Sequence, residues 1–154
     1  MNRIKHMTMK QKKVVNAERK MYTIAKYMLL DEDLAIQISQ EEWIKAFDKI
    51  ERDINNSDLE DMILSNLLDT CLYELTNNEL LKKKELAKEP VLQALSQLEG
   101  RTRATIVLRD IAKLSCEDIA RVMTCDLSEV AATLTLGRCK LKSAFQKNRV
   151  SIVD

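Results

Sequence analysis

Apolar residues recur every three or four positions along most of the chain, which is the spacing of helices that bury one face. The sequence contains only two Gly and one Pro, and such a composition favours helix over turn-rich β folds. We therefore predict an all-α protein. The predicted helices cover 11–30, 31–50, 58–76, 91–98, 102–113, 116–124 and 128–147.

The clearest interruption of this pattern is Pro90. Proline has no backbone N–H and pushes the preceding residue, here Glu89, away from helical angles, so we place a domain boundary there. The 154 residues are enough for one ordinary domain or two small ones, and the interruption at Pro90 favours two. The sequence therefore predicts two small helical domains over 11–84 and 91–150, joined by a short linker over 85–90.

Charge is distributed unevenly, although the net charge is only +1. Residues 3–20 contain seven basic residues and one acidic residue, whereas 31–61 contain eleven acidic and three basic residues. Residues 138–149 contain five basic residues and no acidic one. Such blocks indicate either more than one charged partner or solvated helix faces.

The sequence offers little for catalysis or metal binding. Its only histidine, His6, lies in a terminus predicted to be frayed, so a serine or cysteine nucleophile would lack its base. No two cysteines have CxxC spacing, which argues against a zinc site. Gly100 and Gly137 stand alone rather than in a phosphate-binding loop. We therefore predict no enzymatic activity, no catalytic residue, no metal, no cofactor and no small-molecule substrate.

Cysteine usage and hydropathy favour a cytoplasmic protein. Three of the four cysteines fall at apolar helix positions, where cysteine packs as a small hydrophobic residue, and all four are predicted to be reduced thiols. No apolar stretch follows the basic N-terminus as in a signal peptide. No apolar run approaches the length of a membrane span, so no membrane partner is expected. The cysteines are Cys71, Cys116, Cys125 and Cys139.

The stretch from 115 to 147 predicts a short helix, a tight turn and a longer helix. Ser115, with Asp118 three residues later, has a capping-box pattern that begins the first of these helices. The spacing is that of a helix-turn-helix, whose second helix can enter a DNA major groove about 12 Å wide. Many helical hairpins bind nothing, so the pattern alone leaves both readings open. The candidate DNA-binding residues are Ser128, Glu129, Ala131, Ala132, Thr133, Arg138 and Lys142.

A family resemblance supports the DNA-binding hypothesis. The segment LSQLEGRTRATIVLRDIAKLSCEDIARVMTCDLSEVAATLTLGRCKLKSAF resembles region 4 of bacterial RNA polymerase sigma factors of the sigma-70 family, extracytoplasmic-function type. In that family a Leu and a short break precede an Arg, an apolar LR pair, the helix-turn-helix, and a trailing Arg and Leu. The matching positions are Leu98, Arg103, Leu108, Arg109, Leu114, Ser115, Asp118, Ile119, Ala120, Val130, Leu134, Arg138 and Leu141.

The first half of the chain carries a second resemblance to the same family. The segment YTIAKYMLLDEDLAIQISQEEWIKAFDKI resembles sigma region 2, whose corresponding helix docks on the β′ clamp of core RNA polymerase. The two resemblances together imply a sigma region 2-like helical bundle and a sigma region 4-like helix-turn-helix domain that contacts the β flap. A core role for Trp43 is an equally open alternative. The residues that this resemblance assigns to polymerase binding are Ala35, Gln40, Glu41, Trp43, Ile44 and Phe47.

Several positions depart from the family pattern. Ile63, Thr70 and Asn77 stand where the third helix of region 2 normally carries a Trp, an Asn and an Arg. Because single-stranded bases are held by stacking and cationic grooves, this departure weakens the expectation of conventional promoter melting. The recognition helix begins with residues such as Glu129 rather than Lys or Arg, which predicts weak, salt-dependent duplex affinity. Thr124 replaces the usual Gly, which predicts a turn without positive φ.

The predicted linker is also short for a sigma factor. Six residues span at most roughly 20 Å. Two promoter elements about 17 base pairs apart are separated by about 58 Å along the duplex, at about 3.4 Å per pair. The linker therefore argues against simultaneous contact with both elements.

Three functions follow from the sequence. The first is an alternative sigma factor that binds core RNA polymerase and promoter DNA, with an anti-sigma factor as a possible partner. The second is a degenerate sigma-like regulator that acts through protein–protein contacts with polymerase, an anti-sigma factor or an activator, and the short linker favours it. The third is an ordinary helix-turn-helix repressor, against which the region 2 resemblance argues.

Overall fold

The structure, a computed structural model, describes residues 9–52, 58–83 and 89–153. Within these ranges every regular element is a helix and there is no strand, which confirms the all-α prediction. In chain order the elements are α1 (Met9–Leu29), α2 (Glu32–Arg52), α3 (Asp58–Asn77), α4 (Glu79–Lys83), α5 (Pro90–Ser96), α6 (Gly100–Ile106), the π-helical turn η2 (Val107–Ile111), α7 (Cys116–Met123) and α8 (Leu127–Val153).

The acidic segment between α1 and α2 ends one helix and begins the next, as predicted. Leu30 follows α1 with a positive φ of 56°. The Oδ1 atom of Asp31 accepts a hydrogen bond from the backbone N–H of Leu34 at 2.9 Å. This bond caps α2, because it satisfies one of the N–H groups that the first turn of a helix leaves unpaired. Glu32 and Asp33 lie in the same turn, where their charge complements the helix dipole.

Pro90 is the first residue of α5, where the missing N–H of proline would have no helical partner in any case. Glu89 has φ −90° and ψ 117°, so it is extended, as the following proline predicts. Of the predicted linker over 85–90, only these two residues lie among the described residues. The division into domains over 11–84 and 91–150 stays a prediction.

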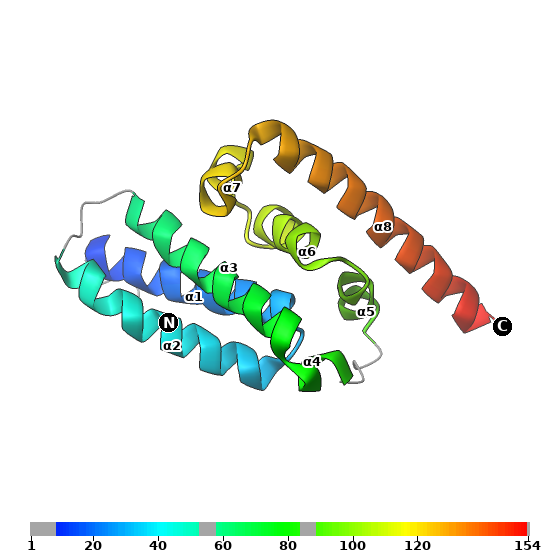
Figure 1. Cartoon of the computed structure of the whole chain (residues 1–154), viewed down its shortest axis with the longest axis horizontal. Helices are drawn as coiled ribbons and strands as arrows, with labels where there is room; N and C mark the ends of the chain where they lie inside the picture. The colour runs from blue at the N-terminus through cyan, green and yellow to red at the C-terminus, as the bar shows by residue number, and fades with distance from the viewer. Residues whose placement is uncertain (1–8, 53–57, 84–88, 154) are drawn as a thin grey trace.

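The stretch predicted as one helix over 102–113 is α6 followed by η2. The N–H of Ala112 donates to the carbonyl oxygen of Val107 at 2.9 Å, so the bond spans five residues instead of four. Every residue from Thr102 to Leu108 is buried, because α6 lies between α3 and α8 (Figure 1). A helix enclosed from several sides has no single apolar stripe, which explains why periodicity defines this segment poorly.

Helix α7 has the predicted cap at its start and an unpredicted conformation at its end. The Oγ atom of Ser115 accepts from the N–H of Asp118 at 3.1 Å, which confirms the cap. Thr124, after the helix, has φ 52° and ψ 57°, so the prediction of a turn without positive φ is wrong. The left-handed residue turns the chain so that the N–H of Cys125 donates to the carbonyl oxygen of Ala120 at 3.0 Å. That bond pairs a carbonyl group that the last turn of the helix would otherwise leave without a partner, as in many helices that end with glycine.

Replacing Thr124 with glycine is therefore expected to stabilise the protein by about 1 kcal/mol, because a β-branched side chain is disfavoured in the left-handed conformation. Urea unfolding followed by circular dichroism measures the change. Thr124→Ala is the matched control, because it shortens the side chain but keeps the Cβ atom that causes the strain, and it is expected to gain less. A glycine variant that is less stable than the alanine variant would contradict a strained turn.

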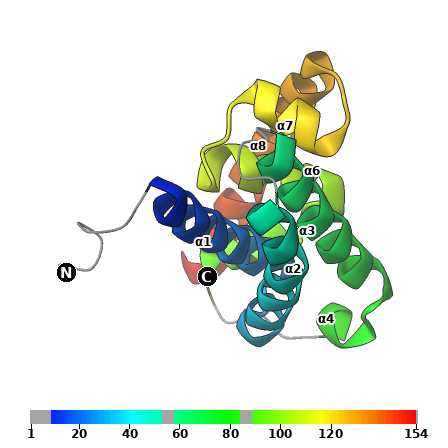
Figure 2. The ribbon, with the colours of Figure 1, turned by 90° about the vertical axis from the view of Figure 1, so that its left-hand side faces the viewer.

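The helices pack in two groups (Figures 1 and 2). Helices α1, α2 and α3 pack against one another side by side, and α5, α6 and α7 each pack against α8. Helix α8 is the longest element, with 27 residues, and it runs along the outer side of the second group. Because α3 contacts both α6 and α7, and α1 contacts η2, the two groups share an extensive interface.

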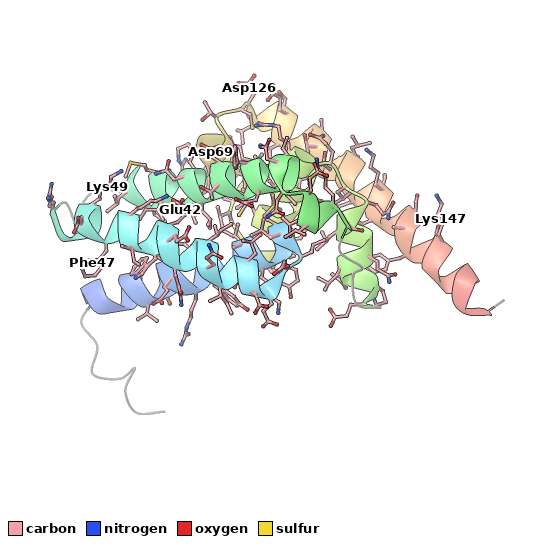
Figure 3. The ribbon with its side chains drawn as sticks, turned by 60° about the horizontal axis from the view of Figure 1, so that its bottom comes forward. Glu42, Phe47, Lys49, Asp69, Asp126 and Lys147 are labelled. Carbon is pink, nitrogen blue, oxygen red and sulfur yellow. The ribbon has the colours of Figure 1, made fainter. Side chains whose placement is uncertain are left out.

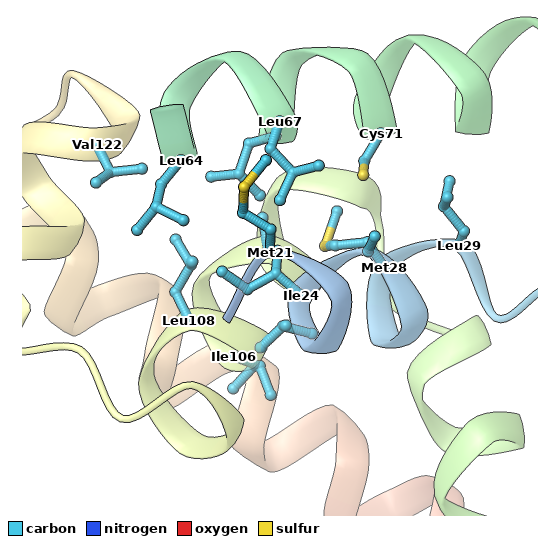
Figure 4. Packing of buried hydrophobic residues seen from close by; sticks show 14 of the residues in the cluster. Met21, Ile24, Met28, Leu29, Leu64, Leu67, Cys71, Ile106, Leu108 and Val122 are labelled. Atoms are coloured by element: carbon cyan, nitrogen blue, oxygen red, sulfur yellow. The ribbon is translucent and has the colours of Figure 1, made fainter. Parts of the chain in front are cut away.

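A single hydrophobic core runs through both groups (Figure 4). Met21 and Ile24 of α1 are fully buried, as is Leu67 of α3. Ile106 and Leu108, from the second half of the chain, lie beside them. Each half therefore covers apolar surface that the other would expose to water if the two separated, and this burial stabilises the packed arrangement.

Arg103 of α6 donates one hydrogen bond across this interface and two within its own half. Its side chain is 7% exposed, and its Nη1 atom donates to the carbonyl oxygen of Met28, near the end of α1, at 2.6 Å. Its Nη2 atom donates to the carbonyl oxygens of Leu98 at 3.3 Å and Ser96 at 3.5 Å, while Nε is buried without a partner. Burial lowers the pKa of Arg103 to about 10, so the guanidinium stays charged at neutral pH and makes strong bonds to these carbonyls.

Candidate partner and nucleic-acid interfaces

One face of α2 presents large apolar side chains to solvent. Ile36 is 40% exposed, Ile44 71% and Phe47 43%. Trp43 is partly buried against the core, and its ring meets that of Phe47 edge-on, with centroids 6.4 Å apart and planes at 62°. Residues spaced by three, four and eight positions share one helix face, so these four side chains form a continuous stripe. A row of exposed apolar side chains on one helix face makes this surface a candidate for binding a partner.

The structure places the predicted polymerase-binding residues in three environments. Gln40, Glu41, Ile44 and Phe47 are exposed, and Trp43 is half-buried. Ala35 is fully buried in the core, so it has no surface to offer a partner in this arrangement. Figure 3 shows Phe47 near the C-terminal end of α2.

Sequence reasoning missed Ile36, which extends the stripe on α2 by two turns. Its spacing of eight residues from Ile44 was the available signal, because eight residues bring a helix back to nearly the same face. The stripe on α2, consisting of Ile36, Gln40, Trp43, Ile44 and Phe47, is called the α2 stripe below.

The helix pair α7–α8 has the short helix, three-residue turn and long helix that the sequence predicts. Ile119 and Val122 of α7 are buried, as are Val130 and Leu134 of α8, so the two helices meet through an apolar contact. This packing fixes the first turns of α8 relative to α7. The exposed side of those turns is thereby presented to solvent at a defined angle.

The predicted DNA-binding residues lie on that exposed side with one exception. Thr133 is partly buried, and the others are exposed. The surface near the turn is acidic rather than basic, since Asp126 and Glu129 are both exposed there. Arg138 and Lys142 supply positive charge only further along α8. The exposed residues are Ser128, Glu129, Ala131, Ala132, Arg138 and Lys142.

Arg138 is held by a carboxylate within its own half of the chain. Its Nη2 and Nε atoms donate to the two carboxylate oxygens of Asp110, at 2.6 Å and 3.2 Å. The hydrogen bond from Arg138 lowers the pKa of Asp110, and the same bond raises the pKa of Arg138. This bidentate pair joins η2 to α8 and occupies two donors of a guanidinium that the sequence assigns to DNA.

Two further arginines lie beside the α7–α8 turn, and sequence reasoning missed both. Arg101 donates from Nη2 to the carbonyl oxygen of Met123 at 3.5 Å, at the end of α7. Arg121, on α7 itself, donates to the carboxylates of Asp61 and Asp118. Arg101 comes from another helix and Asp61 from the other half of the chain, so no local motif indicates either contact.

All four cysteines are free thiols, as predicted. Burial, with smaller contributions from the nearby Glu42 and Glu74, raises the pKa of the Cys71 thiol to about 12, so this thiol stays protonated. Across the described residues, no three histidine, cysteine or acidic side chains gather as a metal site would require. None of the described helices combines the length and apolar character of a membrane span.

The chain shares its fold with a sigma factor. No protein-family model matches the sequence, and comparison with curated proteins gives no match. Among solved structures, the chain is similar to one in the co-crystal structure of the sigma factor RpoE with the anti-sigma factor NepR from Bartonella quintana. The TM-score is 0.72 at 16% sequence identity, over 88% of this chain and 96% of that chain.

This similarity confirms, at the level of the fold, the resemblance to extracytoplasmic-function sigma factors found in the sequence. The protein has the all-helical fold of that sigma factor over 88% of its length.

Proposed function

We propose that the protein is an alternative sigma factor that binds core RNA polymerase in the cytoplasm and directs initiation at specific promoters. The observation that carries this proposal is a sigma-factor fold that spans nearly the whole chain. The region 2-like segment lies on α1 and α2, and the region 4-like segment lies on α5 to α8. Two family segments in the right order on the right fold support a common function more strongly than either does alone.

In this proposal the α2 stripe docks on the β′ clamp of polymerase. Exposed isoleucine and aromatic side chains on a rigid helix suit a protein interface, because they bury large apolar area with little loss of conformational entropy. The second half docks on the β flap by resemblance to region 4. The same resemblance, together with the anti-sigma partner of RpoE, supports an anti-sigma factor as a further partner of this chain.

The α7–α8 pair is proposed to read the upstream promoter element as a helix-turn-helix. Ala131, Ala132 and Thr133 suit apolar contacts with thymine methyl groups, and Ser128 suits a hydrogen bond to a base or phosphate. In this proposal Arg138 and Lys142 contact phosphates of the DNA backbone. Duplex affinity should be weak because Glu129 repels phosphates, and it should fall with salt because the attraction comes from the contacts of Arg138 and Lys142 with phosphates.

A second candidate function is a degenerate sigma-like regulator that binds polymerase, an anti-sigma factor or an activator without recognising promoters. The charge of α3 favours it, because this helix contains five acidic residues and no Lys or Arg. A surface that holds the melted promoter strand needs cationic and stacking groups. The acidic residues of α3 are Asp58, Glu60, Asp61, Asp69 and Glu74.

Run-off transcription separates the two functions. The full-length protein is mixed with core polymerase and a library of promoter fragments, and transcripts are sequenced at low and physiological salt. Initiation at a defined set of promoters supports the sigma factor. Polymerase or anti-sigma binding without initiation supports the degenerate regulator, and indifference to both partners would reject both functions.

Replacing Ile44 with alanine is expected to weaken binding to core polymerase about tenfold, because a large exposed apolar residue at the centre of an interface commonly contributes more than 1 kcal/mol. Binding is measured by fluorescence anisotropy of the labelled protein. Leu80→Ala is the matched control, because Leu80 is 81% exposed but lies on α4, outside the α2 stripe. Equal affinities for the two variants would remove the α2 stripe from the interface.

A further inference from the structure

An arginine of the proposed DNA-reading helix pair is held by the other half of the chain. Helix α7 packs against the beginning of α3 (Figure 2). The Nε atom of Arg121 on α7 donates to Oδ2 of Asp61 on α3 at 3.0 Å. Arg121 also pairs with Asp118 on its own helix. The Arg121 side chain is 56% exposed and that of Asp61 only 24%. The guanidinium therefore lies at the surface, beside a carboxylate that is more deeply buried.

Apolar packing keeps the two residues of this pair close together. Leu64, one turn after Asp61, and Val122, next to Arg121, are each 2% exposed. Figure 4 shows these two side chains at the same part of the interface. The hydrogen bond from Arg103 to Met28, near the end of α1, links the halves at a second place. Asp61 therefore stays beside Arg121 for as long as the halves remain packed.

The chemistry of the pair resembles that of a phosphate contact. Carboxylate and phosphate both present oxygens that match the planar donors of a guanidinium. In a helix-turn-helix the first helix lies across the DNA backbone, so an exposed arginine on α7 is within the part of the motif that contacts phosphates. Asp61 thus accepts a hydrogen bond from the guanidinium of Arg121 that a phosphate oxygen could otherwise accept.

We infer that Asp61 is an intramolecular competitor of DNA, which restrains duplex binding by occupying Arg121 across the interface between the two halves. The inference rests on the proposed DNA binding by α7 and α8. Duplex binding must displace the Asp61 carboxylate from Arg121 or separate α3 from α7. The acidic helix α3, which lacks any Lys or Arg, then acts as an inhibitory element toward the helix pair beside it.

The test is an Asp61→Asn variant of the full chain. Asparagine keeps the shape of the side chain and removes its charge, so Arg121 loses the carboxylate on α3 while keeping its pairing with Asp118. We expect duplex DNA to bind about two- to fivefold more tightly, the range that corresponds to a surface ion pair. Affinity is measured by fluorescence anisotropy with a mixed-sequence duplex at low salt, and circular dichroism verifies the fold.

Glu60→Gln is the matched control. It removes one negative charge from the neighbouring position of α3, but Glu60 pairs with Lys20 of α1 at 2.7 Å and not with Arg121. Little change in affinity is expected. The double variant Asp61→Asn, Arg121→Ala tests the pairing itself, and it should show no gain over Arg121→Ala alone. The inference would be overturned if Asp61→Asn did not bind duplex DNA more tightly than the wild type. It would also be overturned if Glu60→Gln showed the same gain in affinity, or if the gain persisted in the double variant that lacks Arg121.

The outcome is separable from that of the proposed function. A gain that depends on Arg121 supports the inference even if run-off transcription detects no initiation. Initiation by the wild-type protein with no gain in Asp61→Asn would keep the sigma-factor function and reject the competitor role of Asp61.

Discussion

An Arg103→Ala variant is expected to lose about 3 kcal/mol of unfolding free energy, because buried carbonyl groups lose charged donors and a cavity remains. The loss should reach both halves of the protein. Trp43, the sole tryptophan, lies on α2 in the first half, while Arg103 lies on α6 in the second. Urea unfolding is followed by Trp43 fluorescence and by circular dichroism, and the two midpoints are expected to fall together, as in a two-state transition.

Arg101→Ala is the control for this result. Arg101 lies on the same helix two residues earlier, is exposed, and makes one longer bond to the carbonyl of Met123, so its replacement is expected to cost less than about 0.5 kcal/mol. Arg103→Lys keeps the charge but lacks the fork that reaches several carbonyls, and should fall between the two. A Trp43 transition that stays at its wild-type midpoint in Arg103→Ala would show that the halves unfold independently.

Leu108→Ala is expected to destabilise the protein by about 3 kcal/mol, the usual cost of a cavity in a well-packed core. Leu108 is fully buried where α1 and α3 meet the second half (Figure 4). Thermal unfolding, followed by calorimetry, measures the loss. The interface between the two halves can close little of the cavity, because helices from both halves enclose it.

Leu136→Ala is the matched control for Leu108→Ala. Leu136 is also a leucine of the second half, but it is 51% exposed on α8. Its replacement should change stability by less than about 0.5 kcal/mol, since little apolar area leaves the core. Similar losses of stability in Leu108→Ala and Leu136→Ala would contradict the burial of Leu108 at the interface between the two halves.

The sequence predicted those features that depend on neighbouring residues. Asp31 begins α2 and Ser115 begins α7, because a short polar side chain can reach the N–H groups of the next turn without help from the rest of the fold. Pro90 marks a helix start for the same local reason. Helix-spaced apolar residues predicted the all-α fold, because one-sided burial imprints its period on the sequence.

Features set by distant packing were not predicted. Thr124 adopts a left-handed conformation although its side chain disfavours it, because the closure of α7 and the packing of α8 require the turn. Arginine is rarely buried, so no pattern of neighbouring residues indicated that Arg103 would lie at the interface between the two halves. Ala35 matched a family position that the resemblance assigned to polymerase, but the structure buries it. The pairing of Arg121 with Asp61 joins residues sixty positions apart.

The length of α8 has a mechanical consequence. At 1.5 Å per residue its 27 residues make a rod about 40 Å long. A tilt of about 10° at Leu127 would sweep the opposite tip through about 7 Å, by the same helical rise. Because α5, α6 and α7 all pack along this rod, such a tilt would move those helices with it, and a molecule bound at the far end of α8 would thereby displace the turn.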